Sequence, residues 1–370
     1  MTDLTPRQRF LDYVRGAPGA RRVVSPFLPH ADVVEATLRH LGLPVGGEPI
    51  ANEIRLARAV DYEPMFMTDC PGLIFPWAED ATRSDETWTV KVLPAPDGPW
   101  LRRISRRLGE WGDDAGFPVK TEVDYERLIT VAEHAGDREA EIRAYFRRWR
   151  ERVGEEGVVV IGHPHVTWIG YQVSQRNLIF HEHDHPALFR RSMDAIYQAA
   201  CSVFEVAMEE GIDFMSESSS GLEMTSPADF DRLDLPYLQA LADFTHARGG
   251  LFWYHNCGLT RRLIVSGRFN AFGADVIETL APPPEGDNDL AESRRHLDPT
   301  ICTKGNLSLL LLRDGTPEQV TAATRAMVAA VRDRGYGRRH IHSTADAVLT
   351  GTPPENFLAF VRTARDVSEA

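Results

Sequence analysis

The stretch "GGLFWYHNCGLTRR", residues 249–262, contains the pattern from which the fold is predicted. Its apolar and aromatic run over residues 251–254 is typical of a buried strand. The run ends on His255, and Cys257 follows two positions later, ahead of Gly258. Because side chains alternate along a strand, we expect the imidazole and the thiol on the same side. A strand that only packs needs neither group, so this stretch predicts a strand that leads into a functional site.

Runs of the same kind recur along the chain and alternate with longer amphipathic segments. Eight candidate strands lie at 22–28, 64–69, 157–166, 212–218, 250–258, 274–282, 299–306 and 339–344. The clearest helical patterns cover 186–211, 316–335 and 352–365. This alternation predicts an α/β fold, a (β/α)8 TIM barrel, with a doubly wound open sheet as the alternative.

One segment, "WTVKVLPAPDGPWLRRISRRL" at residues 88–108, does not fit a β/α unit. Its two runs of alternating polarity around "PAPDGP" predict a small surface hairpin inserted in the barrel. The sequence has no low-complexity linker and no repeat of fixed period. We therefore expect one barrel domain over residues 1–370.

Composition narrows the class of protein. The chain has 370 residues, of which 43% are hydrophobic, and a formal net charge of −13. A general binder of nucleic acid would carry the opposite charge, so nucleic acid is not an expected partner. No apolar run reaches the roughly 18 residues of a membrane span, and the N-terminal residues lack the apolar segment of a signal peptide. The four cysteines are too scattered for a disulfide framework, and we expect a reduced, cytoplasmic setting.

Polar or metal-competent residues end most of the candidate strands. They are Asp69, His163, His165, Glu217, His255, Cys257, Glu278, Lys304, Asn306 and His342. Burying such a group without a partner costs several kcal/mol, and strands that only pack do not need it. In a β/α barrel the carboxyl ends of all strands meet at one face, so these residues predict one shared site.

The pair His255 and Cys257 offers the nitrogen and thiolate ligands that zinc prefers. The alternative is that Cys257 is a small buried hydrophobe and His255 a hydrogen-bonded residue of the barrel. A catalytic zinc needs about three protein ligands and one open position, and only two candidate ligands are adjacent in the sequence. The metal prediction therefore requires a third ligand from elsewhere in the chain.

From "TPRQRFLDYVRGAP" near its start to "TPPENFLAFVRTAR" near its end, the chain resembles the uroporphyrinogen decarboxylase superfamily. The motifs that carry the resemblance are "GIDFMSESSSGLEMTSPADFD", "HNCG", "GADVIETLAPPPEGDNDL", "KGNLSLLLLRDGTPEQV" and "TPPEN". The superfamily includes the decarboxylase itself and the zinc methyltransferases of corrinoid and coenzyme M metabolism. Its fold is a β/α barrel, which the resemblance implies here as well.

Two segments favour the methyltransferase branch. The decarboxylases carry an arginine-rich segment that grips the propionates of the tetrapyrrole, whereas "SPFLPHADVVEATLRHLGLP", residues 25–44, has no arginine pair. The "HNCG" motif resembles the His-x-Cys-Gly of the methyltransferases, which implies that His255 and Cys257 both bind zinc.

The chain departs from that branch at the third ligand. Several such methyltransferases supply a further cysteine shortly before the segment similar to "TPPEN", but "HIHSTADAVLTGTPPEN" contains none. Asp346 lies nearest the expected position, and His342, Cys302 and Glu217 are the alternatives. A carboxylate is a chemically reasonable zinc ligand.

The resemblance also implies roles for two acids, Asp69 and Glu217, which match positions of family acids. With His165, they are predicted to supply protons or to position the substrate. The residues predicted to bind substrate are His163, Tyr171, Lys304 and His342. For Asp69 the alternative is a turn cap, and for Lys304 it is a salt bridge at the barrel rim.

The run "HEHDHP", residues 181–186, is predicted to be a solvated loop that leads into a helix, with Asp184 or His185 as the cap. It is not expected to be the metal site, although three of its residues are histidines.

The preferred function is a zinc-dependent methyltransferase that moves a methyl group between a small methylated substrate or thiol and a corrinoid. A corrinoid protein and a second copy of the chain are the partners that the resemblance suggests. The alternatives are a metal-independent decarboxylase of a tetrapyrrole or another carboxylate, and a binding protein that has kept the barrel without turnover.

Overall fold

The computed structural model describes residues 4–71, 82–84, 88–93, 98, 100–105, 116–219, 221–223, 225–332 and 339–369. The strands are β1 (Met65–Met67), β2 (Thr82–Ser84), β3 (Trp88–Leu93), β4 (Trp100–Ser105), β5 (Val158–Val160), β6 (Phe214–Ser219), β7 (Leu251–Asn256), β8 (Val276–Thr279), β9 (Cys302–Leu307) and β10 (His340–Thr344).

The helices begin with α1 (Pro6–Val14), α2 (Ala31–His40), α3 (Pro49–Val60), α4 (Glu122–Glu133), α5 (Glu139–Val153), α6 (Gln175–Asp184) and α7 (Pro186–Glu209). They continue with α8 (Pro227–Asp229), α9 (Leu235–His246), α10 (Arg261–Val265), α11 (Leu290–His296), α12 (Leu309–Asp314), α13 (Pro317–Arg332) and α14 (Pro354–Glu369). Shorter turns are η3 (Ala135–Arg138), η4 (Ile169–Tyr171), η5 (Phe230–Asp234) and η6 (Arg268–Asn270).

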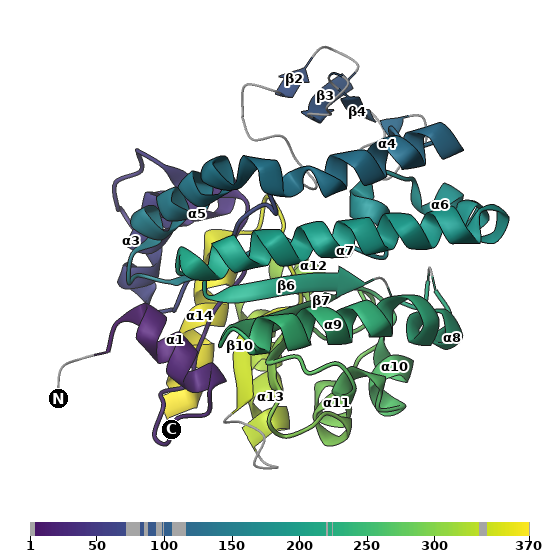
Figure 1. Cartoon of the computed structure of the whole chain (residues 1–370). Helices are drawn as coiled ribbons and strands as arrows, with labels where there is room; N and C mark the ends of the chain where they lie inside the picture. The colour runs from purple at the N-terminus through teal and green to yellow at the C-terminus, as the bar shows by residue number, and fades with distance from the viewer. Residues whose placement is uncertain are drawn as a thin grey trace.

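Seven strands form one parallel sheet in the order β1-β5-β6-β7-β8-β9-β10. The sheet is curled like part of a barrel, and helices such as α7 and α9 pack on its outer face (Figure 1). Parallel strands joined through helices are the arrangement that the alternating pattern predicts. The α/β class and seven of the eight predicted strands are therefore confirmed.

The eighth predicted strand, residues 22–28, is wrong as a regular strand. This segment makes only two isolated parallel bridges to the β10 side of the sheet, Val24 to His342 and Phe27 to Ala347. On its other side, the carbonyl of Val24 accepts a hydrogen bond of 2.9 Å from the backbone N–H of Glu63. Pro26 has no N–H and interrupts the ladder. The segment thus lies between β10 and β1 as a seam, and the sheet is barrel-like without a continuous ladder around it.

The predicted hairpin is confirmed where the structure describes it. Strands β3 and β4 pair antiparallel, and β2 adds to β3 to make a separate three-stranded sheet. This small sheet lies beyond α4, at the top of Figure 1. Residues 94–97, 99 and 106–108 of the predicted segment, which include most of its turn, lie outside the described residues.

The three helices predicted most clearly are α7, α13 and α14. Helix α7 begins with Pro186 and buries one face, as its amphipathic pattern requires. The prediction of a loop at residues 181–186 is wrong, because residues 181–184 form the last turn of α6. His185 stands at the start of α7, but its side chain makes no capping hydrogen bond.

Toward the amino ends of its strands, the interior of the sheet is apolar. Phe10 of α1 packs on Phe214 of β6 and on Trp253 of β7, with ring centroids 5.9 and 6.5 Å away. All three side chains are buried, and each such aromatic stabilises the fold by about 2–3 kcal/mol. Because this end is filled, the polar strand ends can form an open site only at the opposite, carboxyl end.

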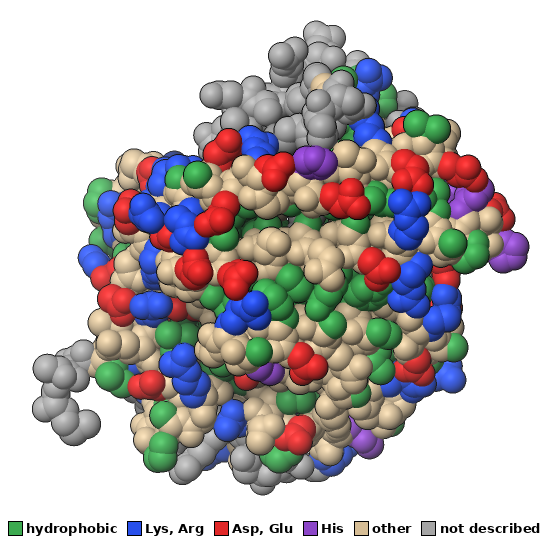
Figure 2. All heavy atoms as spheres, viewed as in Figure 1, with side chains coloured by type: hydrophobic (Ala, Val, Ile, Leu, Met, Phe, Trp, Pro, Cys, Tyr) green, Lys and Arg blue, Asp and Glu red, His purple; other side chains and the backbone are tan. Residues whose placement is uncertain are grey.

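The outer surface carries both signs of charge close together. Figure 2 shows basic and acidic side chains interspersed over the helices of one face. Arg143 of α5, for example, contacts Glu139 on its own helix and Glu209 at the end of α7, with N–O distances of 2.7 and 2.6 Å. Within the described parts of the chain, no helix is both long enough and apolar enough to cross a bilayer. The four cysteines are free, and Cys70, Cys201 and Cys302 are buried.

Candidate active site

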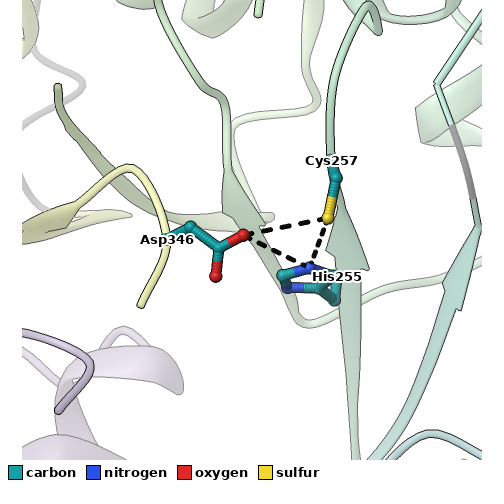
Figure 3. Close-up of side chains that lie close together, drawn as sticks. All are labelled: His255, Cys257 and Asp346. Atoms are coloured by element: carbon teal, nitrogen blue, oxygen red, sulfur yellow. Dashed lines mark hydrogen bonds and ion pairs between the residues drawn. The ribbon is translucent and has the colours of Figure 1, made fainter. Parts of the chain in front are cut away.

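Three side chains with metal-competent atoms meet at the carboxyl end of the sheet (Figure 3). His255 is the last residue but one of β7, Cys257 follows the strand, and Asp346 comes two residues after β10. The Nε2 atom of His255 lies 2.7 Å from the Sγ atom of Cys257, and both lie 3.9 Å from Oδ2 of Asp346. We call these three residues the metal-ligand corner. They bring together one nitrogen, one sulfur and one oxygen within 4.8 Å of one another.

The ring of His255 is oriented from behind by a buried ion pair. Its Nδ1 atom lies 2.8 Å from Oε1 of Glu278, whose Oε2 accepts a hydrogen bond of 3.1 Å from Nζ of Lys304. Glu278 and Lys304 are 2% and 1% exposed, so their charges compensate each other in the sheet interior. A carboxylate at Nδ1 leaves Nε2 facing Cys257 and Asp346, as in histidines that bind metals.

The charges around His255 and Glu278 also shift the pKa values of these two side chains. Burial raises the pKa of the Glu278 carboxyl, but Lys304 and His255 outweigh that effect and hold the pKa well below its ordinary value. Burial lowers the pKa of His255, but Cys257, Glu278 and Asp346 together raise it well above its ordinary value.

A cavity of about 360 Å³ opens beside the metal-ligand corner. It is lined by His163, His165, Trp168, Tyr171, Ser218, Ser219, Gly221, Glu223, His255, Cys257 and Gly258. The predicted metal ligands His255 and Cys257 and the predicted site residues His163, His165 and Tyr171 therefore do lie around one cavity. A volume of this size suits a small molecule.

One side of the cavity comes from the segment after β5. We call His163, His165, Trp168 and Tyr171 the loop wall. The ring of His163 stacks on His255 at 5.2 Å, and the ring centroids of His165 and Tyr171 are 3.7 Å apart. Burial and the nearby His255 lower the pKa of His163 to about 3, which keeps its imidazole neutral. Its Nδ1 atom lies 2.8 Å from the hydroxyl of Ser216.

The backbone of the loop wall is unusual. His165, Ile169 and Tyr171 have φ values of 54°, 51° and 59°, in the left-handed region that ordinary side chains disfavour. Gly170 adopts φ 60° between them, where a glycine is not strained. Strained backbone persists only where the surroundings hold it, and it concentrates at functional sites.

Glu217 holds this backbone in place. Its carboxylate accepts hydrogen bonds from the backbone N–H groups of His165, Val166 and Ser218, at 3.1, 3.0 and 2.7 Å. The side chain is buried, and it does not line the cavity among the described residues. Burial raises the pKa of Glu217 to about 8, although the three N–H groups favour the charged form. The structure therefore places Glu217 behind the loop wall, where it positions His165.

Other predicted residues lie away from the cavity. Asp69 is exposed after β1, and its carboxylate lies 3.5 Å from the hydroxyl of Tyr145. Lys304 is buried in its ion pair with Glu278, which matches the alternative interpretation of a salt bridge. His342 is buried on β10, where burial lowers its pKa to about 3. Cys302 belongs to the apolar interior. Of the four alternatives for a third ligand, only Asp346 joins His255 and Cys257 in a cluster within the described residues.

Two residues of the cavity lining, Trp168 and Glu223, were not predicted from the sequence. Glu223 is exposed at the cavity, and its Oε1 accepts a hydrogen bond of 2.8 Å from the backbone N–H of Leu259. It belongs to the loop after β6, and no strand period directs attention to it. Two glycines could have signalled a close approach, because a Cβ at Gly221 after β6 or at Gly258 after β7 would overlap the Glu223 carboxylate.

Comparisons with known proteins agree with this fold. A sequence profile of the uroporphyrinogen decarboxylase (URO-D) family matches residues 117–367. The uroporphyrinogen decarboxylase of Synechococcus sp. (strain CC9605) is 27% identical over 238 residues, which cover 60% of this chain and 62% of that protein. That of Parasynechococcus marenigrum (strain WH8102) is 28% identical over 236 residues, covering 60% of this chain and 61% of the relative. The chain thus spans about three fifths of the length of these curated relatives.

Among solved structures, a methyltransferase from Methanosarcina mazei has a similar fold. The two structures superpose with a TM-score of 0.65 over 100% of both chains, at 16% sequence identity. This similarity extends over the whole chain and therefore includes the residues before 117.

Proposed function

Because the chain belongs to the uroporphyrinogen decarboxylase family, we propose that it is a zinc-dependent methyltransferase that moves a methyl group between a small methylated substrate or thiol and a corrinoid. The metal-ligand corner is the observation that carries this proposal. It offers imidazole, thiolate and carboxylate donors, a set that suits zinc and leaves a fourth position for substrate. The corrinoid would be carried by a partner protein, and a homodimer and a cytoplasmic location remain part of the proposal.

The donor set passes a test of fit. Metal-binding histidines commonly donate the N–H of their second ring nitrogen to a carboxylate, and His255 has Glu278 at that position, with Oε1 2.8 Å from Nδ1. When bound, zinc would lower the pKa of a thiol in its open position, or polarise an ether oxygen of a methoxy group.

The residues of the chain supply orientation around that position. Glu278 and Lys304 fix the direction of His255 Nε2. His163 packs against the ring of His255, and both side chains line the cavity, so a substrate in the cavity would lie beside the metal-ligand corner. His165 lies on the same cavity, where its Nδ1 is 2.9 Å from the hydroxyl of Ser218, and is placed to exchange a proton with substrate.

Decarboxylation of a tetrapyrrole is the second candidate, because the curated relatives bear that name. A tetrapyrrole with several carboxylates needs basic partners. The cavity lining, as far as the structure describes it, includes no arginine and no lysine. This observation supports methyl transfer over binding of a polyanionic tetrapyrrole.

The test is metal analysis of the purified protein after loading with zinc and desalting. We expect about one zinc per chain in the native protein, and a loss of at least tenfold in zinc affinity for His255→Ala and for Cys257→Ala. Cys201→Ala is the matched control, since that cysteine is buried on α7 away from the cavity, and it should retain zinc. Native protein that binds no zinc would overturn the proposal and favour a metal-independent decarboxylase.

A further inference from the structure

The loop wall contains an aromatic corner that the metal-ligand corner does not explain. The rings of Trp168 and Tyr171 meet at 88° with their centroids 5.1 Å apart. Both side chains line the cavity and are partly buried. In this edge-to-face contact the two ring planes form a corner, and a rounded group can contact both rings on the side of Tyr171 away from the His165 ring, whose centroid is 3.7 Å away. This is the geometry by which aromatic side chains bind alkylated ammonium groups.

A carboxylate lies on the same cavity. Glu223 is the one acidic side chain among the described residues that line the cavity, and it is exposed. Its Oε1 is fixed by the N–H of Leu259, and Gly258 gives it room, because a Cβ there would overlap the carboxylate. The negative charge of Glu223 is therefore held in one place at the cavity.

The charges around the cavity select the sign of its ligand. A divalent cation together with the thiolate of Cys257 and the carboxylate of Asp346 would be neutral overall. Glu278 and Lys304 neutralise each other behind His255. Among the described lining residues, Glu223 then adds a negative charge that no lysine or arginine compensates. A positively charged ligand is favoured in such a site, and an anion is disfavoured.

From these observations we infer that the substrate is a small molecule with a methylated ammonium group, held against the faces of Trp168 and Tyr171 with Glu223 as its counter-charge. The inference rests on the proposed function for the reaction at the metal, but the binding of the ammonium group does not depend on zinc. The ammonium group is the part that the protein recognises, and it keeps the rest of the molecule beside the metal-ligand corner.

Choline and its neutral isostere 3,3-dimethylbutan-1-ol provide the test, since they differ in charge and match in shape. Binding is measured by titration calorimetry and by the change in tryptophan fluorescence at constant ionic strength. We expect choline to bind at least about tenfold more tightly than the alcohol, because only the cation gains from the ring faces and the carboxylate. Equal binding of the two compounds, or no binding of choline, overturns the inference.

Two variants locate the site. Glu223→Gln keeps an oxygen for the N–H of Leu259 but removes the charge, and Trp168→Leu removes one ring face. Each should weaken choline binding roughly tenfold, while Glu151→Gln, an exposed acid on α5, should leave it unchanged. If Trp168→Leu lowers the thermal midpoint markedly, Glu223→Gln alone decides, because its side chain is exposed. Native affinity in Glu223→Gln contradicts the inference.

The same titration after treatment with a chelator, and in Cys257→Ala, separates this inference from the proposed function. Choline binding that persists in both supports the ammonium site even if zinc analysis fails. Protein that binds zinc but discriminates poorly between choline and the alcohol keeps the proposed function and loses this inference.

Discussion

The two sides of the cavity are built in different ways. The metal-ligand corner comes from the carboxyl ends of β7 and β10: the parallel sheet holds His255, and Cys257 and Asp346 follow one and two residues after their strands. The loop wall comes from a left-handed segment after β5, with positive φ at His165, Ile169 and Tyr171. The metal-ligand corner is stabilised by the Glu278–Lys304 ion pair behind His255. The loop wall is stabilised by the Glu217 carboxylate, which accepts hydrogen bonds from three backbone N–H groups.

This difference separates two tasks. A reactive centre needs ligands placed within a fraction of an ångström, and strand ends provide that precision. Recognition of a substrate needs a surface that can differ between proteins with the same sheet, and loops provide that freedom. The molecule thus has one side suited to chemistry and one side suited to selection, and the variants below test whether each can be changed without the other.

The largest effect should come from breaking the ion pair behind the metal-ligand corner. Lys304→Met removes one of the two partners of the buried Glu278 carboxylate, which keeps its contact with His255, so we expect a loss of about 3–5 kcal/mol in the free energy of unfolding in urea. The double variant Lys304→Met with Glu278→Gln should recover part of that loss, because no isolated charge remains. A loss below about 1 kcal/mol in the single variant would mean that this side is not held by charge.

On the loop wall, Glu217→Ala should have the next largest effect. It leaves the N–H groups of His165, Val166 and Ser218 without their acceptor, and we expect a loss of about 3 kcal/mol in urea unfolding. Zinc content should stay at the native level, because the metal ligands lie on other strands. Glu126→Ala, which removes an exposed ion pair to Arg191, is the control and should cost no more than about 1 kcal/mol. Loss of zinc together with stability would show that the two sides are not independent.

The smallest effect concerns the dependence of stability on pH. Asp234 is buried, and its Oδ1 accepts a hydrogen bond of 3.1 Å from Thr167 in the loop-wall segment. Burial raises the pKa of Asp234 to about 7, whereas the unfolded chain releases this proton near pH 4. The folded state therefore binds more protons between about pH 4 and 7, and stability falls as the pH rises through that window.

Asp234→Asn keeps the acceptor oxygen and removes the titration. Between pH 5 and pH 8 the native protein should lose about 2 kcal/mol more than the variant, measured by urea unfolding at both values. Parallel losses in the two proteins would contradict the raised pKa.

The same difference explains what the sequence could predict. His255 and Cys257 were found because strand periodicity places them on one side, and in the structure His255 Nε2 and Cys257 Sγ lie 2.7 Å apart. Asp346 could be named only as one of four alternatives, since its approach depends on where β10 lies beside the rest of the sheet. Seven strands followed from their apolar runs, whereas Pro26 made the eighth a seam.

The loop wall was less accessible to sequence analysis. Ile169 and Tyr171 adopt left-handed conformations in a short turn whose backbone hydrogen bonds are local, and no sequence pattern indicates a positive φ at an isoleucine or a tyrosine. Glu217 drew attention as an acid at a strand end, but its role depends on which N–H groups face it. Glu223 and Trp168 became relevant only once the folded chain brought two loops to one cavity.

The seam between β10 and β1 gives the metal-ligand corner a second consequence. Asp346 lies immediately before Ala347, the residue bridged to Phe27 across the seam, while His255 and Cys257 lie on and just after β7. A cation shared by these three side chains would join two segments that are 89 residues apart, at the place where the ladder is interrupted. Such a cation would act as a cross-link as well as taking part in the reaction. The backbone N–H of Ser25 donates across the seam to the carbonyl of His342, and that of His342 donates to the carbonyl of Val23. These two amide protons should therefore exchange with solvent more slowly in the metal-loaded protein than in the chelated one.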